Sequence, residues 1–212
     1  QGMSNSFEWW QAQRDALAEL GLTDAEGGAD GQPSWPKPIA DSIALLVDEV
    51  SPASWFRLVH RCIDAFEVLV KYCVVVAASD LLAREQPPEA IRQMMLDSLR
   101  RPALGHWYGY LRAISEHLSA AGVAPFMPEL EPFRKKCHPL IERFISFRNS
   151  YAHGATPSEE ECEQDLRGAL KDYLDLLAAA GFLKRYTLLV FDGCRACTAM
   201  GAGLQSAGGA EN

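Results

Sequence analysis

Three side chains that could bind and cleave a phosphodiester lie together between residues 148 and 154. Arg148 supplies a guanidinium, Asn149 an amide and His153 an imidazole. Residues four apart share one face of an α-helix, so Asn149 and His153 would project from the same side. A guanidinium can clamp a phosphate through paired hydrogen bonds, and an imidazole titrates near neutral pH. This combination favours chemistry on an anionic substrate such as a phosphodiester.

The spacing between arginine and histidine is not specific by itself. An arginine followed five positions later by a histidine occurs three times, at Arg101/His106, Arg112/His117 and Arg148/His153. Only the third pair has an asparagine after the arginine and an Ala-His-Gly ending. We expect Gly154 to end the helix at the C′ position, because glycine readily takes the left-handed conformation found there.

The stretch from Phe147 to Gly154 resembles the RNxxAHG motif of HEPN domains (higher eukaryotes and prokaryotes nucleotide-binding), which are all-α modules. The resemblance covers about residues 51–182, and its specific part is eight residues long. It implies an antiparallel helical bundle of the HEPN type. Many members of the family are ribonucleases, which form dimers that bring two Arg/His motifs into one cleft. The resemblance therefore implies a homodimer that acts on RNA.

The resemblance also implies a role for each residue of the motif. His153 would act as general acid or base, helping the RNA 2′-hydroxyl attack the adjacent phosphate without a metal ion or other cofactor. Arg148 would bind the phosphate and stabilise developing charge. Asn149 would orient His153 or hydrogen-bond the substrate. Tyr151 would stack on a base or pack against its own bundle.

Glu67 has two interpretations. It lies four residues before Lys71 on a long predicted helix, and this spacing is typical of a surface ion pair. The HEPN resemblance instead implies that Glu67 holds Arg148 in place, since an acid on an earlier helix often does so in this family. An acid among apolar neighbours is usually paired, which agrees with either interpretation.

Three functions stay open. The resemblance favours a metal-independent endoribonuclease module of a toxin, defence or stress system, with an antitoxin or other regulatory protein as a further partner. A non-catalytic helical module for binding or dimerisation, controlling an attached domain, is the alternative. In that case Arg148 and Asn149 would hydrogen-bond to the carbonyls at the end of the helix. His153 would interact favourably with the negative end of the helix dipole. Nucleotide binding, which the family name records, has no motif here.

Charge is unevenly distributed along the chain. The 212 residues carry a net charge of −8, so there is no overall basic footprint for nucleic acid. Residues 132–154 nevertheless hold five lysines and arginines against one glutamate, which gives +4, and residues 158–165 are strongly acidic. The motif therefore lies in a locally basic segment, which is either a phosphate-binding surface or a solvated helix face.

The cysteines and the apolar runs indicate a cytoplasmic protein with reduced thiols. Cys62 and Cys73 lie in apolar helical context and are expected in the core. Cys194 and Cys197 have a zinc-like spacing, but no second pair accompanies them, so no metal site is predicted. No secretory signal is visible, and the longest apolar run, from Tyr72 to Ser79, is too short to span a membrane.

Helix start and stop residues divide the chain into three parts: an N-terminal helix and linker (1–38), a HEPN-like helical domain (39–183), and a β-strand with a Gly/Ala-rich tail (184–212). The last part would be the stub of a second domain or one arm of a hairpin. Expected helices cover 7–20, 39–50, 51–84, 89–101, 104–121, 133 or 139 to 153, and 157–180, and a strand covers 185–191.

Several residues are expected to bound these helices. Ser6 would cap the first helix and Gly21 would end it. Ser51-Pro52 would begin the long helix, Pro87-Pro88 would follow it, and Gly122 would end the fifth. The sequence Thr156-Pro157-Ser158-Glu159 predicts a capping box at the start of the last helix, and Gly181 would end that helix.

Overall fold

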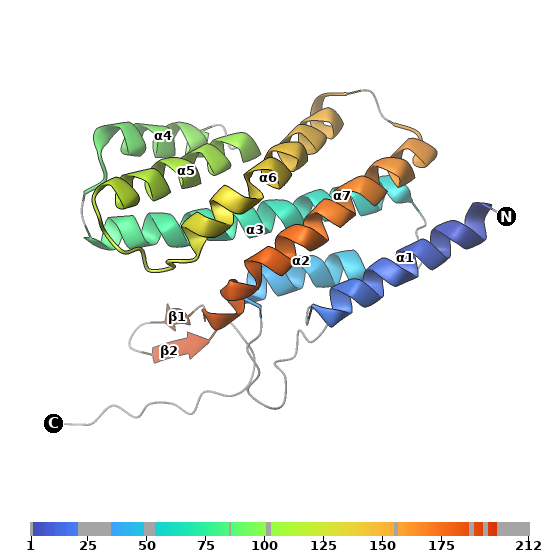
Figure 1. Ribbon diagram of the computed structural model, residues 1–212, viewed down its shortest axis with the longest axis horizontal. Coiled ribbons are helices and arrows are strands. Elements are labelled where there is room, and N and C mark those ends of the chain that lie inside the picture. Colours follow the sequence, from blue (N-terminus) through green and yellow to red (C-terminus); the bar gives the residue numbers. More distant parts are fainter. Residues whose placement is uncertain are drawn as a thin grey trace.

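Seven α-helices packed as a bundle make up most of the structure (Figure 1). The computed structural model describes residues 2–20, 35–48, 54–84, 86–100, 103–154, 157–186, 189–192 and 195–198. The helices are α1 (Gly2–Glu19), α2 (Lys37–Val47), α3 (Trp55–Arg84), α4 (Glu89–Arg100), α5 (Leu104–Ala120), α6 (Leu130–His153) and α7 (Glu159–Ala179). The expected all-α bundle is therefore confirmed.

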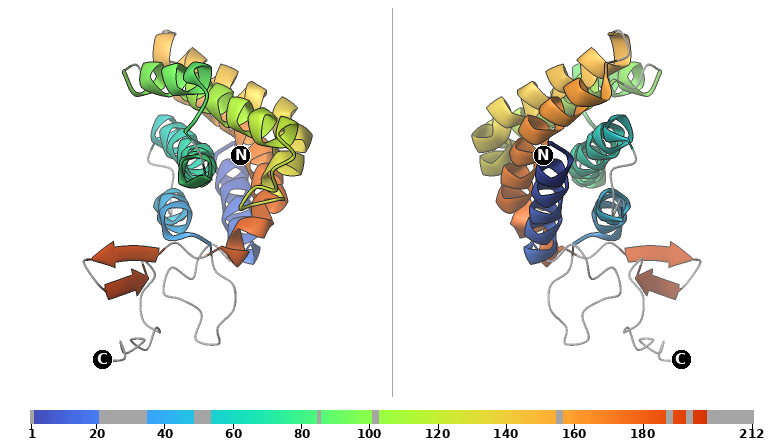
Figure 2. Two further views of the ribbon diagram at one scale, coloured as in Figure 1. Left: turned by 90° about the vertical axis from the view of Figure 1, so that its left-hand side faces the viewer. Right: turned by 90° about the vertical axis from the view of Figure 1, so that its right-hand side faces the viewer.

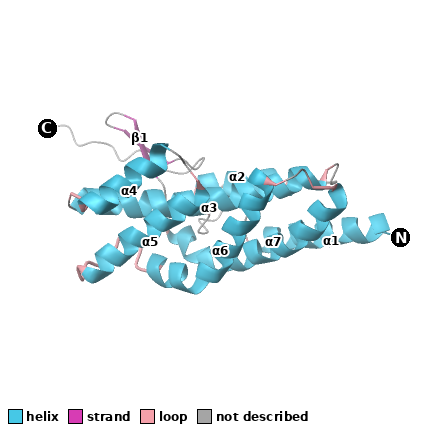
Figure 3. Ribbon diagram, turned by 90° about the horizontal axis from the view of Figure 1, so that it is seen from above, coloured by secondary structure: helices cyan, strands magenta, loops and turns pink. Residues whose placement is uncertain are grey.

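A short irregular segment and two strands follow α7. The chain tightens into a 3-10 helix (Ala180–Arg185), and β1 (Leu189–Asp192) then pairs antiparallel with β2 (Arg195–Thr198), Leu189 opposite Thr198. Figure 3 shows β1 beyond the helices. Within the described residues, no helix is long and apolar enough to cross a membrane.

The long helix α3 lies at the centre of the bundle. It contacts α2, α5, α6 and α7. The end-on views show α2 and α5 on opposite sides of α3, and α1 beside α7 (Figure 2). A helix surrounded in this way must be apolar on several faces, which agrees with its fourteen buried residues.

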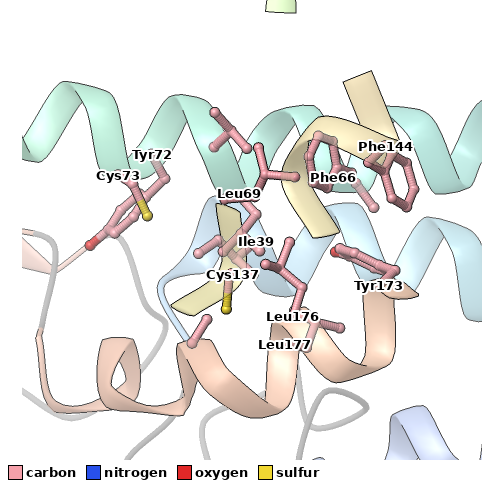
Figure 4. Packing of buried hydrophobic residues seen from close by; sticks show 14 of the residues in the cluster. Ile39, Phe66, Leu69, Tyr72, Cys73, Cys137, Phe144, Tyr173, Leu176 and Leu177 are labelled. Atoms are coloured by element: carbon pink, nitrogen blue, oxygen red, sulfur yellow. The ribbon is translucent and has the colours of Figure 1, made fainter. Parts of the chain in front are cut away.

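The core forms where α3, α6 and α7 meet. Phe66 of α3 stacks on Phe144 of α6 with ring centroids 4.1 Å apart, and Tyr173 of α7 lies against Phe144 (Figure 4). Val59, Ile63, Phe66 and Val70, which recur at every third or fourth position of α3, are buried, and Phe56 is partly buried. Each such large side chain contributes about 1.5–3 kcal/mol on burial. The apolar repeat of α3 therefore marks the face that packs in the core.

The predicted burial of Cys62 and Cys73 is also confirmed. Both are free thiols in the core, as are Cys137 and Cys162. Burial raises the pKa of the Cys73 thiol to about 12 and raises that of Cys62 as well. These thiols are thus poor nucleophiles, because the thiolate is the reactive form.

The N-terminal helix α1 shares this core. Trp10 and Leu17 are fully buried. Arg14 Nε donates to the carbonyl oxygen of Val47 at 2.9 Å, and the Arg167 guanidinium lies 4.3 Å from the ring centroid of Trp9. These contacts attach α1 to α2 and α7.

Some expected helix boundaries are confirmed and others are wrong. The α4 helix begins directly after Pro87-Pro88, and Gly122 follows α5 with a φ of +66°. Ser6 is not a cap, because α1 already begins at Gly2; its hydroxyl donates to Glu163 instead. Gly21 and Ser51-Pro52 lie outside the described residues.

The capping box of α7 lies two residues later than predicted. Ser158 is the N-cap, and its side chain and that of Glu161 bond reciprocally to the backbone. Glu159 accepts hydrogen bonds from the Ser54 hydroxyl and from the amides of Trp55 and Phe56. The predicted partner of Thr156 is therefore used to cap α3. Thr156 itself lies outside the described residues.

The ends of α6 and α7 also differ from expectation. The α6 helix begins at Leu130 and continues through Pro139, whose missing amide hydrogen leaves the Lys135 carbonyl without its usual helical donor. Gly181 does not end the last helix; it lies inside the 3-10 segment that follows α7. That segment includes Arg185, the first residue of the expected strand 185–191, whereas β1 covers Leu189–Asp192.

Candidate functional site

The end of α6 carries the motif, and Gly154 ends the helix without the left-handed conformation that we predicted. Its φ is −85° and its ψ is 176°, and its amide donates to the Ser150 carbonyl at 2.9 Å. A Cβ added at this position would lie 2.5 Å from the Ser150 carbonyl oxygen. Glycine is therefore needed here because the backbone approaches closely, and a positive φ has no part in it.

Arg148 and Glu67 are brought together across the bundle. Arg148 Nε donates to Glu67 Oε1 at 3.1 Å, and Lys71 Nζ binds Glu67 Oε2 at 2.7 Å. Both interpretations of Glu67 thus describe real contacts. The side chains of Arg148 and Glu67 are 24% and 18% exposed, so solvent only partly screens this pair.

Glu67 does not hold the two terminal guanidinium nitrogens of Arg148. Nη1 donates to Asn149 Oδ1 at 3.4 Å, and Nη2 has no partner among the described residues. Glu67 therefore fixes one edge of the guanidinium and leaves another edge able to bind an anion. Bidentate binding of phosphate needs such an edge.

His153 and Asn149 are both exposed. Within the described part of the chain, the His153 ring has no hydrogen-bond or ion-pair partner, whereas Asn149 bonds to Arg148. The amide therefore contacts the guanidinium, and the imidazole at the helix end is accessible to a substrate or to a second copy of the chain.

Tyr151 points to the other side of α6, toward α7. Its hydroxyl donates to Asp165 Oδ2 at 3.0 Å, and its ring lies 5.0 Å from that of Phe147, edge to face. Desolvation raises the pKa of Tyr151, and its hydrogen bonds with Cys162 and Asp165 add to that. Tyr151 thus packs against residues of its own bundle, and stacking on a base stays a prediction.

Two neighbours of the motif were not identified from the sequence. His60 lies edge to face with Tyr151, with centroids 6.2 Å apart, and its Nε2 is buried without a partner among the described residues. Asp165 holds the Tyr151 hydroxyl. His60 precedes Glu67 by seven residues, which is about two helical turns, so the two residues share one face of α3. This spacing is the sequence signal that could have identified His60.

The locally basic segment does not form a basic surface. Arg134 is buried and pairs with Glu131, Lys135 also reaches Glu131, and Arg143 binds Asp172 through two hydrogen bonds of 2.9 and 2.8 Å. With Arg148 paired as well, only Lys136 lacks an ion-pair partner among the described residues. The charge of +4 along the sequence is therefore largely neutralised in space.

A small pocket beside the motif contains two acidic side chains. It has a volume of about 270 Å³ and is lined by Ser150, Tyr151, Pro157, Glu161, Gln164 and Asp165. Its two carboxylates oppose binding of a phosphate on this side of α6. Any phosphate would thus bind on the other side, where Asn149 and His153 are exposed.

Comparison of the chain with protein-family models, with curated proteins and with solved structures found no match. Among the described residues, no group of three or more histidine, cysteine, aspartate or glutamate side chains is arranged to hold a metal ion. Cys194 lies outside the described residues. The HEPN resemblance therefore stands on the motif from Phe147 to Gly154.

Proposed function

We propose that this chain is a HEPN-like, metal-independent endoribonuclease module that acts as a homodimer in a toxin, defence or stress system. One observation carries the proposal: Glu67 holds one edge of Arg148, while His153 is exposed at the end of the same helix. A fixed cation near an accessible imidazole suits transfer of a phosphoryl group.

In the proposed reaction His153 removes the proton from an RNA 2′-hydroxyl. The 2′-oxygen then attacks the adjacent phosphorus, the bond to the 5′-oxygen breaks, and the leaving oxygen takes up a proton. The products are a 2′,3′-cyclic phosphate and a 5′-hydroxyl. Arg148 binds the non-bridging oxygens, where negative charge develops.

A second copy of the chain supplies what one motif lacks. The reaction needs a base for the 2′-hydroxyl and an acid for the 5′-oxygen, and each motif offers one exposed imidazole. Pairing two α6 ends would place one His153 on each side of the scissile bond. The exposure of His153 supports this arrangement, because a buried ring could not face a partner.

The alternative function is a non-catalytic module for binding or dimerisation that regulates an attached domain. The neutralised cations of α6 and the acidic pocket beside Tyr151 favour it, since both reduce the attraction of RNA. In this case the Arg148–Glu67 pair serves to join α6 to α3.

Cleavage of RNA in the presence of a chelator separates the two functions. The wild-type chain and its His153→Ala variant are incubated with mixed single-stranded RNA and EDTA, at concentrations where dimer is measured by ultracentrifugation. We expect the wild type to release fragments with cyclic phosphate ends, and the variant to release none. His117→Ala is the matched control, because His117 follows Arg112 at the same spacing without the asparagine or the glycine.

Absence of cleavage by concentrated, dimeric wild type would contradict the nuclease proposal and favour the binding module. Equal loss of cleavage in His117→Ala would also contradict it, because that residue lies outside the proposed site. Circular dichroism of each variant excludes unfolding as the cause.

A further inference from the structure

A second candidate site lies at the opposite end of α6 from His153. It is a cavity of about 400 Å³ between α3, α5, the connection from Gly122 to Glu129 and the first residues of α6. This volume is within the range of small-molecule sites, about 300–1,000 Å³. The nuclease proposal makes no use of it.

The wall of the cavity is mainly apolar. Val76 of α3, Ile114 and Leu118 of α5, Met127 of the connection and Leu130 of α6 all line it. Four of these five side chains are buried, and Val76 is half-buried. Such a wall favours an aliphatic or aromatic ligand, because burial of apolar surface is the main source of its affinity.

One largely buried residue of this apolar wall carries a hydroxyl. Ser115 lines the cavity and is only 9% exposed. Its side chain has no hydrogen-bond partner among the described residues. A ligand that hydrogen-bonds to this hydroxyl would take the place of water, and a polar group of this kind fixes the orientation of a ligand in a mainly apolar site.

The charged residues of the wall are both acidic. Asp80 binds Arg84 at 2.6 Å and accepts from the Phe126 amide at 2.7 Å, which ties the connection to α3. Glu131 binds Arg134 at 2.7 Å. Among the described residues that line the wall, none is a lysine or an arginine. An anionic ligand would meet these carboxylates first, so a neutral ligand is favoured.

From these observations we infer that the cavity between α3, α5 and α6 binds an uncharged, mainly aliphatic molecule whose single hydroxyl or carbonyl group hydrogen-bonds to Ser115. The site is separate from the Arg148/His153 site and does not depend on RNA cleavage.

The test uses 1-octanol as the neutral probe and octanoate as an anion of the same length, both added to the full chain at pH 7.5. Ligand-observed NMR and the shift in Tm give the affinities. Val76→Phe should fill the cavity. Val75→Phe is the matched control, since Val75 is the next residue on α3, is 54% exposed and does not line the cavity. Ser115→Ala removes only the hydroxyl.

We expect saturable binding of octanol, and binding of octanoate about tenfold weaker. Ser115→Ala should weaken the binding of octanol by about two- to tenfold, because one hydrogen bond is lost. Val76→Phe should abolish binding and Val75→Phe should leave it unchanged. Absence of saturable binding, equal binding of octanoate, or equal affinity in Val76→Phe and Val75→Phe would overturn the inference.

A second measurement covers the case in which Val76→Phe does not fold. A photoreactive diazirine analogue of octanol is activated on the wild-type chain, and the labelled peptides are identified by mass spectrometry. Labels within residues 76–80 and 114–132 agree with the inference, and labels only elsewhere contradict it.

Discussion

Glu67 and Arg148 are 81 positions apart in the sequence and meet through a hydrogen bond of 3.1 Å between Oε1 and Nε. The contact joins the middle of α3 to the last turns of α6. It orients the guanidinium in the same segment that presents His153 to solvent. The pair is thus both a link between two helices and the fixed part of the candidate site.

The first prediction concerns the strength and role of this pair. A double-mutant cycle with Glu67→Gln and Arg148→Gln should give a coupling energy of about 0.5–1 kcal/mol in unfolding free energy, because the pair is only partly buried. If the nuclease proposal holds, Glu67→Gln should also lower kcat for RNA by about ten- to hundredfold with less effect on KM, since Arg148 is mispositioned.

Lys71→Gln is the control for this cycle. It removes the contact of Lys71, whose side chain is 42% exposed, with Glu67 Oε2 and leaves the contact with Arg148. Cleavage should therefore be unchanged. A coupling energy of zero between Glu67 and Arg148 would show that the contact does not form in solution.

The second prediction concerns Gly154. Gly154→Ala should destabilise the protein by about 1–2 kcal/mol, as overpacking changes do, because the new Cβ would lie 2.5 Å from the Ser150 carbonyl oxygen. Thermal or urea denaturation measures the change. Gly168→Ala, in the exposed middle of α7 with open space around it, should instead stabilise by about 0.5–1 kcal/mol. Equal effects at the two positions would contradict the close approach at Gly154.

The helices and their buried faces could be predicted because their causes are local. Prolines at 87 and 88 separate α3 from α4, and the apolar repeat of α3 marks its core face. The contact of Glu67 with Lys71 follows from helical spacing alone. The contact with Arg148 could be expected only from the motif resemblance, because no local pattern joins positions 81 apart.

The surface charge and the capping box could not be predicted, because they depend on residues that other parts of the folded bundle supply. The count of +4 in residues 132–154 ignored Asp172 of α7, which neutralises Arg143, and the Glu131 that precedes the segment. The capping box was misplaced because Glu159 accepts hydrogen bonds at the start of α3, which the local sequence does not reveal. Charge and capping patterns thus describe one segment, whereas the surface depends on the packed bundle.

The third prediction concerns the buried Tyr173. Its hydroxyl has no partner among the described residues, and desolvation raises the pKa of this tyrosine well above its ordinary value. Tyr173→Phe should therefore be neutral or stabilising by about 1 kcal/mol, because the ring stays and an unsatisfied polar group is removed. Denaturation midpoints measure this.

Tyr108→Phe is the matched comparison. The Tyr108 hydroxyl is hydrogen-bonded to His138 Nδ1 at 2.8 Å. Removal of this hydroxyl should therefore lower the free energy of unfolding by about 1 kcal/mol. If Tyr173→Phe proved as destabilising as Tyr108→Phe, the Tyr173 hydroxyl would have a partner in solution, and its place in the core would need revision.

The last prediction concerns acid stability and the contact of Glu159 with the start of α3. The hydrogen bond from the Ser54 side chain, with those from the amides of Trp55 and Phe56, lowers the pKa of Glu159 below its ordinary value of 4.5. The contribution of Glu159 to the free energy of unfolding is therefore complete above pH 4.5, the ordinary value. It is lost as pH falls through the lowered pKa. Glu159→Gln should cost about 0.5–1 kcal/mol at pH 7, toward the low end for a helix cap because the carboxylate is exposed.

The difference between wild type and Glu159→Gln should shrink as unfolding free energies are measured from pH 7 down to pH 3. It shrinks because protonation removes from the wild type the charge that the variant already lacks. Glu160→Gln is the control, since Glu160 lies in the same first turn of α7, is exposed and has no hydrogen-bond partner among the described residues. A cost at Glu160 as large as that at Glu159 would assign the effect to the dipole of α7 and not to the cap on α3.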